Sequence, residues 1–581
     1  MPRVDRPVAG AVAAGAAPAA TKVIAAGAKF APGLARMASA AAVSTLLLLT
    51  ACSGGSASGG ASAGAAQANI LLRGNGPDPD SLDPQRARSV ESQTVLRDLC
   101  EGLTTLAKDA STAPGVAKEW TVSPDGKTYT FTLRDEARWS NGDKVVAQDF
   151  VAGLRRLVDP GTASQYAQII DVVANVPDII GGKKKPEELG VAAPNDDTVV
   201  VSLAAPAPYL PGLFAHTSTC PVHRPTLAAH PDEIARPGVM VSNGAFQLKE
   251  WVPGLHILAV RNPYYWNNAA NRLDGVKFMQ IADENAELTR YRAGDLHVTV
   301  VVPRAQFDWI KQSLASELHV SPQLNTYYYG FNLHRAPFRN NVPLRRALSM
   351  VIDRERLAQA VLKVGEVPAY GWIPPGVHDY TSQHFDYAST PIVDRITEAR
   401  KLYAAAGYSA AKPLRFELRY NSGEVHDRLA VAITSMWKEA LGAEVQPLAV
   451  EFKSLLQDID RGDVDMFRSS WLGDYNDAYT FAQYLKSDFG INLPHYQSAD
   501  YDRLLIAAAA EADATKRREL LQQAESVALK DHPLVPLYFY VNKHLVKPQV
   551  QGWYDNVMNV VYSRDLALRP ALSPVLTKPG S

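Results

Sequence analysis

The sequence predicts an α/β or α+β protein of several domains. Segments with strand signals and segments with helix signals alternate from residue 69 onward, which is typical of mixed folds. The 581 residues are enough for about four domains at roughly 150 residues each. No repeat period is evident, which argues against solenoids and propellers.

The composition indicates a folded, nearly neutral protein. Hydrophobic residues make up 46% and charged residues 20%, which is typical of a globular chain with a sizeable core. Lys and Arg number 59 against 60 Asp and Glu, so no basic surplus points to nucleic acid. With only 3 Cys, the chain is not a disulfide-dense scaffold.

The N-terminal segment resembles a secretory signal. No acidic residue occurs between Asp5 and Asp78, while several basic residues precede an apolar stretch over 37–51. This stretch is shorter than the roughly 20 residues that a membrane-spanning helix needs. A basic region, a short apolar region and small residues before a cleavage site predict a signal peptide over 1–51.

Cys52 is expected to carry a lipid anchor. The sequence Leu49-Thr50-Ala51-Cys52 resembles the bacterial lipobox, in which the cysteine is lipidated and becomes the mature N-terminus. More than one acyl chain is needed for stable anchoring. The Ser/Gly/Ala-rich sequence that follows predicts a flexible tether over 52–68.

Clear strand and helix patterns follow one another along the mature chain. The β-forming residues of 128–133, 197–203 and 443–450 predict strands, and Asn141-Gly142 predicts a turn. Helical patterns cover three further segments, the first of them closed by Gly407, namely 394–406, 426–441 and the long segment 501–529.

No pattern of a known catalytic or metal site stands out. HExxH and a Walker-type phosphate loop are absent from the sequence, and GxSxG occurs only at 60–64, within Ser/Gly/Ala-rich sequence and not between a strand and a helix. His216, Cys220, His223 and His230 lie close together in sequence, but no second paired motif completes a zinc site. We therefore expect polar residues of a loop around Pro221, with no metal, no cofactor and no enzymatic activity.

An ordered series of motifs resembles the solute-binding proteins of peptide ABC importers, the family 5 oligopeptide-binding lipoproteins. The resemblance covers nearly the whole mature chain and is nearest to the oligopeptide branch. Its motifs occur in family order: Asp80-Ser81-Leu82-Asp83-Pro84, Cys100-Glu101-Gly102-Leu103, Trp139-Ser140-Asn141-Gly142-Asp143, Asn243-Gly244-Ala245-Phe246, Arg261-Asn262-Pro263-Tyr264-Tyr265-Trp266, Thr326-Tyr327-Tyr328-Tyr329-Gly330-Phe331-Asn332 and Pro368-Ala369-Tyr370-Gly371.

The resemblance implies a class II-type two-lobed binding-protein fold with three domains, one of them inserted. Distant segments then form one lobe, which explains why the composition shows no clean linker. The implied division is lobe 1 (domain I) from 69–100, 223–324 and 542–581, inserted domain II from 101–222, and lobe 2 (domain III) from 325–541.

Arg468 and Asp474 are the first candidates for ligand binding. Alternation along a strand would place Arg468 on one face with Met466 and Ser470. The residues alone favour a structural ion pair or a side chain that reaches the solvent. The resemblance instead implies that Arg468 receives a peptide carboxylate and that Asp474 binds the α-ammonium, through strong charge-assisted hydrogen bonds.

Five further ligand-binding candidates come from the resemblance. His426 matches a histidine that receives the carboxylate of longer peptides, although an exposed residue in the first helical turn is the alternative. Tyr166 matches a tyrosine near the ligand backbone. Phe452 matches an aromatic residue that lines a side-chain pocket, where a core residue is the alternative. Trp471 and Val90 complete the set.

The chain departs from the oligopeptide branch at several positions. Arg88 replaces a glutamate near the ligand, Leu362 replaces a lysine and Val300 replaces an asparagine, so peptide length and carboxylate placement are open. Asn325 and Leu472 replace both halves of a disulfide of enteric members. Cys100 and Cys220, the remaining mature cysteines besides Cys52, are expected to pair because the envelope is oxidising.

The resulting hypothesis is a lipid-anchored, extracytoplasmic or periplasmic protein of the cell envelope. It captures oligopeptides between two lobes, closes by a hinge motion, and delivers them to a permease and ATPase. The protein itself is expected to be a monomer. An alternative within the binding class is another solute, such as a murein peptide, an opine or a nickel chelate. A secreted hydrolase, and a chaperone or adhesin, are the alternatives from other classes.

Overall fold

The computed structural model describes residues 69–569. The expected signal peptide, the tether and Cys52 lie outside the described residues. Strands and helices are mixed throughout, and they form three main sheets. The predicted α/β fold class is therefore confirmed. Within the described part, no helix combines the length and apolarity needed to cross a membrane.

The first sheet has four strands in the order β1-β10-β9-β8. β1 (Ile70–Gly74) pairs parallel to β10 (Gly275–Met279), and β9 (His256–Arg261) pairs antiparallel to both β10 and β8 (Phe246–Val252). The strand β1 thus joins a sheet whose other strands follow about 170 residues later. Three α-helices lie near these strands in sequence: α1 (Val90–Leu99) follows β1, and α6 (Glu284–Ala293) and α7 (Phe307–Ser313) follow β10.

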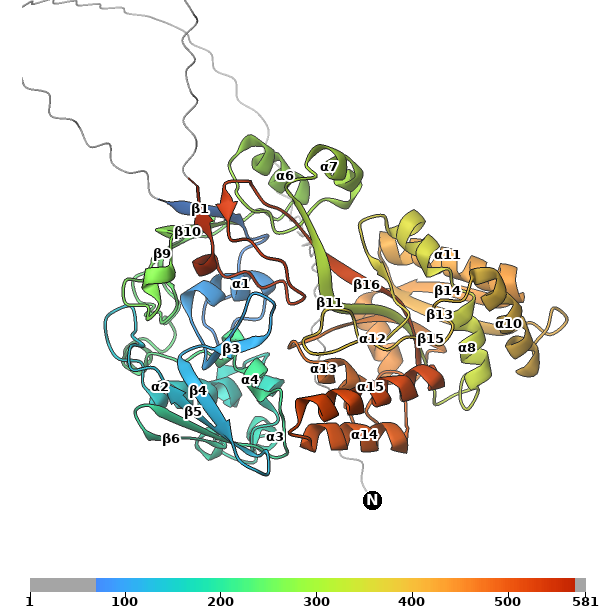
Figure 1. Cartoon of the computed structure of the whole chain (residues 1–581), viewed down its shortest axis with the longest axis horizontal. Helices are drawn as coiled ribbons and strands as arrows, with labels where there is room; N and C mark the ends of the chain where they lie inside the picture. The colour runs from blue at the N-terminus through green and yellow to red at the C-terminus, as the bar shows by residue number, and fades with distance from the viewer. Residues whose placement is uncertain (1–68, 570–581) are drawn as a thin grey trace, which may run out of the picture. The chain divides into compact units, whose positions relative to one another are not determined.

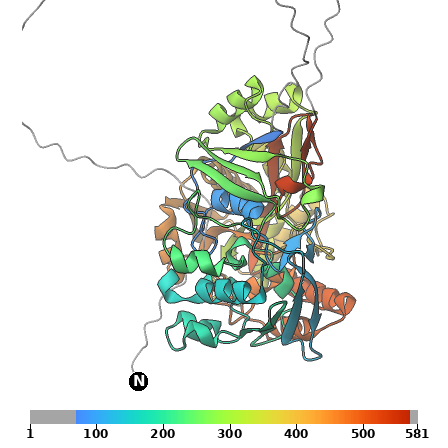
Figure 2. The same ribbon diagram turned by 90° about the vertical axis from the view of Figure 1, so that its left-hand side faces the viewer.

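A second sheet is built entirely from the segment between α1 and β8. Its order is β4-β5-β7-β6, and every pairing is antiparallel. Figure 2 shows these cyan-to-teal elements beside the green strands β8–β10. The elements are β2 (Thr104–Leu106), β3 (Thr112–Pro114), β4 (Ala117–Val122), β5 (Thr128–Leu133), β6 (Val191–Asn195), β7 (Thr198–Ser202), α2 (Ala147–Val158), α3 (Val176–Ile180), α4 (Leu210–Leu213) and α5 (Arg224–Ala229).

The third sheet has six strands in the order β12-β16-β11-β15-β13-β14. The parallel pair β13 and β14 is joined by α11, the kind of crossover that parallel strands require. The long strands β11 and β16 lie side by side in Figure 1. The six strands are β11 (Leu318–Phe331), β12 (Val367–Pro368), β13 (Arg415–Asn421), β14 (Glu444–Val450), β15 (Met466–Leu472) and β16 (Leu534–Leu545).

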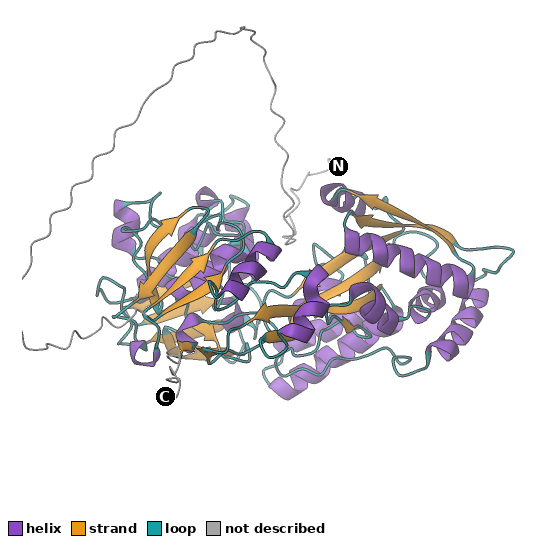
Figure 3. Cartoon of the chain, turned by 90° about the horizontal axis from the view of Figure 1, so that it is seen from above, coloured by secondary structure: helices purple, strands orange, loops and turns teal. Residues whose placement is uncertain are grey.

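Helices cover both faces of this third sheet, as Figure 3 illustrates. Tyr327 and Tyr329 of β11 join the core under α8, α10 and α11, whereas Tyr328 joins the core of α12 to α15. Alternation along the strand thus divides three consecutive tyrosines between two cores. The helices are α8 (Val342–Met350), α9 (Arg354–Arg356), α10 (Ile392–Ala405), α11 (Glu424–Leu441), α12 (Phe452–Asp460), α13 (Tyr479–Ala482), α14 (Ala499–Ala510) and α15 (Ala514–Asp531). Two short strands, β17 (Val550–Gln551) and β18 (Ala567–Leu568), pair near the C-terminus.

Most elements predicted from sequence patterns are confirmed. The strands at 128–133, 197–203 and 443–450 correspond to β5, β7 and β14. The helices at 394–406 and 426–441 correspond to α10 and α11, and Gly407 follows α10 with a φ of 90°.

The helical segment predicted over 501–529 is confirmed, but it contains a break that the sequence pattern did not reveal. The structure has two helices, α14 and α15, separated at 511–513. The side chain of Asp513 accepts a hydrogen bond from the backbone N–H of Lys516 and so begins a new helix. Both helices keep their apolar residues toward the same core, which is why the hydrophobic pattern alone did not reveal the break.

Candidate ligand-binding site

Arg468 is a buried cation near the middle of β15. It lies opposite Tyr329 of β11, and only 8% of its surface is exposed. Its Nη1 donates to Asn421 Oδ1 at 3.0 Å, and its Nη2 donates to the Tyr540 hydroxyl at 3.2 Å. The guanidinium also lies over the ring of Tyr327, 4.5 Å from its centroid.

No carboxylate neutralises Arg468 among residues 69–569. Its contacts are an amide, a phenol and a ring, and the buried Nε has no hydrogen-bond partner. The structural ion pair favoured by the residues alone is therefore not formed. Because a buried, unpaired charge is costly, this arrangement is suited to receiving an anionic group from outside the chain.

His426 lies beside this cation, in the first turn of α11. Its Nδ1 is 3.1 Å from the Tyr327 hydroxyl, and the two rings are 5.6 Å apart. Burial, together with the positive charge of Arg468, lowers the pKa of His426 to about 3. The imidazole is therefore neutral at physiological pH, so it contributes a hydrogen bond rather than a second positive charge.

Asp474 follows β15 in the loop that leads to α13. Its backbone N–H donates to Thr480 Oγ1 at 3.2 Å, but its carboxylate has no hydrogen bond or ion pair within the described part of the chain. Water reaches the side chain, yet protein surrounds it closely enough to desolvate it. This desolvation, followed by the negative charge of Asp171, raises the pKa of Asp474 to about 6.

The Asp474 loop is held in place by neighbouring segments as well as by hydrogen bonds within the loop. Arg517 of α15 donates to both carboxylate oxygens of Asp477, at 2.8 and 2.9 Å. Tyr475 stacks on Tyr209 with ring centroids 4.8 Å apart. Tyr209 belongs to the segment that carries the second sheet, so the loop is fixed from two sides.

The other sequence candidates occupy separate places. Tyr166 accepts a hydrogen bond from Gln93 Nε2 of α1 at 2.8 Å, and its phenol is close enough to feel the charge of Asp474. Trp471 donates to the carbonyl of Thr480 at 2.8 Å. Phe452, half-buried, begins α12, and Val90, 55% exposed, begins α1. The structure thus groups Arg468 with His426, and Asp474 with Tyr166. Within residues 69–569, no hydrogen bond, ion pair or ring contact joins the side chain of Phe452 or Val90 to either group.

Sequence reasoning missed the residues that hold the two charges. Asn421, Tyr327 and Tyr540 surround Arg468 from three other strands, and Asp171 lies near Asp474. The run Tyr327-Tyr328-Tyr329 was a usable signal, because alternation places its outer tyrosines on one face. No local signal in the sequence links Asn421 or Tyr540 to Arg468.

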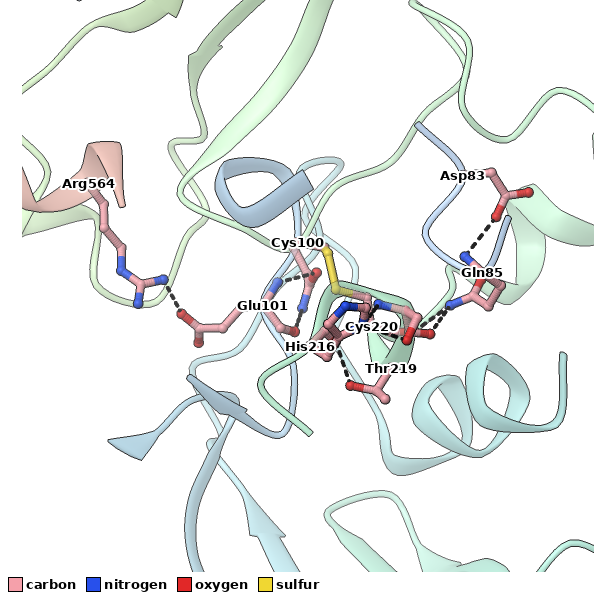
Figure 4. The surroundings of a disulfide bond; sticks show 10 residues. Asp83, Gln85, Cys100, Glu101, His216, Thr219, Cys220 and Arg564 are labelled. Atoms are coloured by element: carbon pink, nitrogen blue, oxygen red, sulfur yellow. Dashed lines mark hydrogen bonds and ion pairs between the residues drawn. A yellow bond between two sulfur atoms is a disulfide. The ribbon is translucent and has the colours of Figure 1, made fainter. Parts of the chain in front are cut away.

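Cys100 and Cys220 form a disulfide in the structure, as expected, with Cα atoms 6.2 Å apart (Figure 4). The bond joins the end of α1 to the end of the segment that carries the second sheet. Nearby, Gln85 Nε2 donates to the carbonyl of Cys220 at 3.0 Å, and Arg564 pairs with Glu101 at 3.0 Å. The disulfide and these two contacts fix both ends of that segment.

The histidines around Pro221 have local partners. His216 lies 2.8 Å from the Ser218 hydroxyl, and His223 lies 3.0 Å from Asp143. Within residues 69–569, no three His, Cys, Asp or Glu side chains are grouped so as to hold a metal ion.

Two positions that depart from the oligopeptide branch face each other. Asn325 of β11 and Leu472 of β15 are direct partners in the strand register, at the end of β15 that leads to Asp474. Arg88 forms an exposed ion pair with Asp80 at 3.4 Å, and the backbone N–H of Val300 donates to Glu287. Leu362 is buried.

Two cavities of the described part lie apart from Arg468 and Asp474. One is behind the disulfide and is lined by residues such as Trp139 and His223. The other is lined by Arg86, Arg155, Arg156 and neighbouring residues of the second-sheet segment. The candidate ligand-binding residues are therefore identified by their unpaired charges.

Comparison with known proteins identifies the family. The model of bacterial extracellular solute-binding proteins, family 5 Middle, matches residues 111–492. The periplasmic oligopeptide-binding protein OppA of Salmonella typhimurium is 39% identical over 491 residues, covering 84% of this chain and 90% of the relative. The probable deoxycholate-binding periplasmic protein YgiS of Escherichia coli is 38% identical over 507 residues, covering 87% and 94%.

Solved structures agree with this result. The unliganded open form of the murein tripeptide-binding protein MppA has a TM-score of 0.82 at 36% identity, covering 87% of this chain and 98% of that chain. Haemophilus influenzae OppA in complex with the peptide RPPGFSPFR has a TM-score of 0.67 at 38% identity, covering 86% and 99%. The fold is thus that of the two-lobed periplasmic binding proteins, and the chain belongs to the bacterial extracellular solute-binding proteins of family 5.

Proposed function

We propose that this protein captures oligopeptides between two lobes and delivers them to the permease and ATPase of an ABC importer. The observation that carries the proposal is a pair of unpartnered opposite charges, one within β15 and the other in the loop that follows it. Arg468 has no carboxylate partner and Asp474 has no cation partner among the described residues. A zwitterionic peptide supplies both missing partners.

The chemistry of these two groups suits peptides of varied sequence. Every unmodified peptide has an α-ammonium and a carboxylate, so charge-assisted hydrogen bonds to Asp474 and Arg468 can recognise all of them. His426 adds a neutral donor or acceptor beside the carboxylate group. A micromolar complex needs about −8 kcal/mol, which two buried charge contacts and several backbone hydrogen bonds can supply.

We infer the same division into domains that the sequence suggested. Lobe 1 consists of 69–100, 223–324 and the chain from 542, with 101–222 inserted, and lobe 2 consists of 325–541. The first and second sheets each lie within one of these parts. The long strands β11 and β16 extend across both proposed boundaries between the lobes, which makes them the candidate hinge.

We infer a lipid anchor at Cys52, which places the protein at the extracytoplasmic face of the envelope. We also infer that the protein acts as a monomer. The OppA relative is described as periplasmic. The family consists of solute-binding proteins and not enzymes, so a secreted hydrolase is set aside. Mass spectrometry of the mature N-terminus is the direct test, because a diacylglyceryl-modified Cys52 has a defined mass.

A second candidate ligand deserves a direct comparison, because two relatives of nearly equal identity differ in the ligand that their names give. A bile acid such as deoxycholate is an anion without an ammonium group. It would satisfy Arg468 and leave Asp474 unpaired, so the structure favours the peptide.

Mass spectrometry of ligands released by denaturing the protein purified from cells is the test of function. We expect a mixture of short peptides, and calorimetric binding of tri- to pentapeptides that exceeds binding of deoxycholate. Recovery of no peptide, together with no calorimetric signal from tri- to pentapeptides, would exclude the proposal. Stronger binding of deoxycholate than of every peptide would favour the second candidate.

A further inference from the structure

Arg97, in the last turn of α1, is a second cation without a partner. It is half-buried, and it forms no hydrogen bond, ion pair or ring contact with another residue of 69–569. The other half-buried or buried arginines in this part of the chain each have at least one such contact. A cation held away from bulk water without a partner is unfavourable unless something else neutralises it.

The charges around Arg97 do not balance. The adjacent Asp98 forms no ion pair with Arg97, and it accepts from the backbone N–H of Ser563 at 3.0 Å. Arg73 also lies near Asp98, and it donates to the carbonyl of Val561 at 2.9 Å. Glu101 is already paired with Arg564. Two arginines therefore share one available carboxylate, and Arg97 carries the surplus positive charge.

Arg97 faces the same side as the candidate ligand group around Tyr166. Gln93 lies four residues earlier, on the same face of α1, and donates to the Tyr166 hydroxyl at 2.8 Å. The Tyr166 ring lies 4.7 Å from the ring of His216. Burial, followed by the nearby charge of Arg97, lowers the pKa of His216 to about 3, so this histidine adds no positive charge.

Tyr166 links this cluster to Asp474. The phenol lies within electrostatic reach of both Arg97 and Asp474, so both charges belong to the surroundings of Tyr166. Arg468 is held among strands of the third sheet, by Asn421 and Tyr540. The two cations thus belong to different elements, and Arg97 is the one that shares the neighbour Tyr166 with Asp474, the residue proposed to bind the peptide ammonium.

We propose that Arg97 is a second anion-binding group of the ligand site, which receives the acidic side chain of a residue at the first or second position of the peptide. This inference rests on the proposed function. Its ligand class is peptides with Asp or Glu near a free amino terminus. The guanidinium and a carboxylate form a charge-assisted, bidentate contact that a neutral amide cannot reproduce.

Calorimetry with matched tripeptides tests the inference on the full mature protein. The ligands are Ala-Ala-Ala, Glu-Ala-Ala, Gln-Ala-Ala, Ala-Glu-Ala and Ala-Gln-Ala. We expect the wild type to bind Glu more tightly than Gln by about tenfold at one of the two positions. Arg97→Gln should abolish this preference, whereas its affinity for Ala-Ala-Ala should change less than about threefold.

Two variants serve as controls. Arg97→Lys keeps the positive charge and should retain most of the preference for Glu. Arg236→Gln removes an exposed arginine that already pairs with Glu233 and should leave the preference intact. An equal loss for all five peptides in Arg97→Gln would indicate a structural role and overturn the inference, as would an unchanged preference.

The wild-type measurement decides the matter even if Arg97→Gln does not fold. Equal affinities of wild type for Glu and Gln at both positions overturn the role of Arg97 while leaving peptide binding established. Absence of binding to every tripeptide overturns the proposed function itself, and this inference with it.

Discussion

The two ends of the candidate site share one strand and its loop, yet they hold charge in different ways. Arg468 is almost fully buried in β15 and is stabilised by Asn421, Tyr540 and the ring of Tyr327. Asp474 is reachable by water, and its carboxylate has no hydrogen-bonding neighbour in the described chain. Asp474 lies six positions after Arg468 in the chain. The cation is held rigidly by its contacts, whereas the carboxylate is free to adapt to a ligand.

The difference predicts different responses to pH and to mutation. A guanidinium stays charged at any pH that the folded protein survives, so Arg468 is a permanent receptor for an anion. Because the pKa of Asp474 is raised to about 6, its carboxylate gains or loses its charge within the range of pH that an envelope protein meets. The charge of Arg468 therefore does not change with pH, whereas the charge of Asp474 is lost in acid.

Arg468→Met tests the rigid end and should have the largest effect. We expect affinity for peptides with a free carboxylate to fall about 100-fold, because a buried charge contact is lost. C-terminally amidated peptides should lose far less. The free energy of unfolding of the empty protein should stay equal or rise, because an unpaired buried cation is replaced by an apolar side chain.

Calorimetry and denaturant titration measure both quantities. Arg346→Met is the matched control, because Arg346 already pairs with Asp386 on the same part of the chain. It should leave peptide affinity unchanged. A lower stability for Arg468→Met, with equal losses for free and amidated peptides, would show that Arg468 is structural.

Asp474→Asn tests the adaptable end and should have a smaller effect. Affinity for peptides with a free amino group should fall about 30-fold, less than at Arg468 because water already reaches the carboxylate. N-acetylated peptides lack the ammonium and should be nearly insensitive. Asp488→Asn, which alters an exposed carboxylate paired with Lys486, is the control. Equal losses for free and acetylated peptides would contradict the assigned role.

The pH dependence of binding separates the two ends directly. An ammonium partner lowers the pKa of Asp474 in the complex, so affinity should be full above pH 6. It should then fall as the pH drops below about 6. The fall should approach roughly tenfold per pH unit until the pKa of the complex is reached. Calorimetry from pH 7.5 to 4.5 measures it, and a wild-type profile parallel to that of Asp474→Asn would refute the assignment.

Tyr540→Phe should have the smallest effect of the four. It removes the hydroxyl that accepts from Arg468 Nη2 at 3.2 Å, and the guanidinium keeps its contacts with Asn421 and Tyr327. We expect affinity for peptides with a free carboxylate to fall about threefold, the effect of one modest hydrogen bond. Tyr408→Phe is a control on the same part of the chain. A change as large as that of Arg468→Met would mean that Tyr540 itself contacts the ligand.

Local patterns predicted much of the framework because their physical signals are local. The β-forming residues of β5 and β14 and the apolar periodicity of α11 are visible in short windows. The break between α14 and α15 was missed because a single Asp513 cap interrupts a pattern that continues on both sides. The family motifs supplied Arg468, Asp474 and the fold itself.

The sequence by itself determined which residue types are present, their periodicity, and the cysteine pair that forms the disulfide. It could not determine which charges are neutralised, because 59 basic and 60 acidic residues offer a partner for every charge. Only the tertiary structure decided that Arg468, Asp474 and Arg97 have no charged partner among residues 69–569. Pairing requires side chains to meet within a few ångströms, and the neighbours concerned come from strands and helices far apart in the chain.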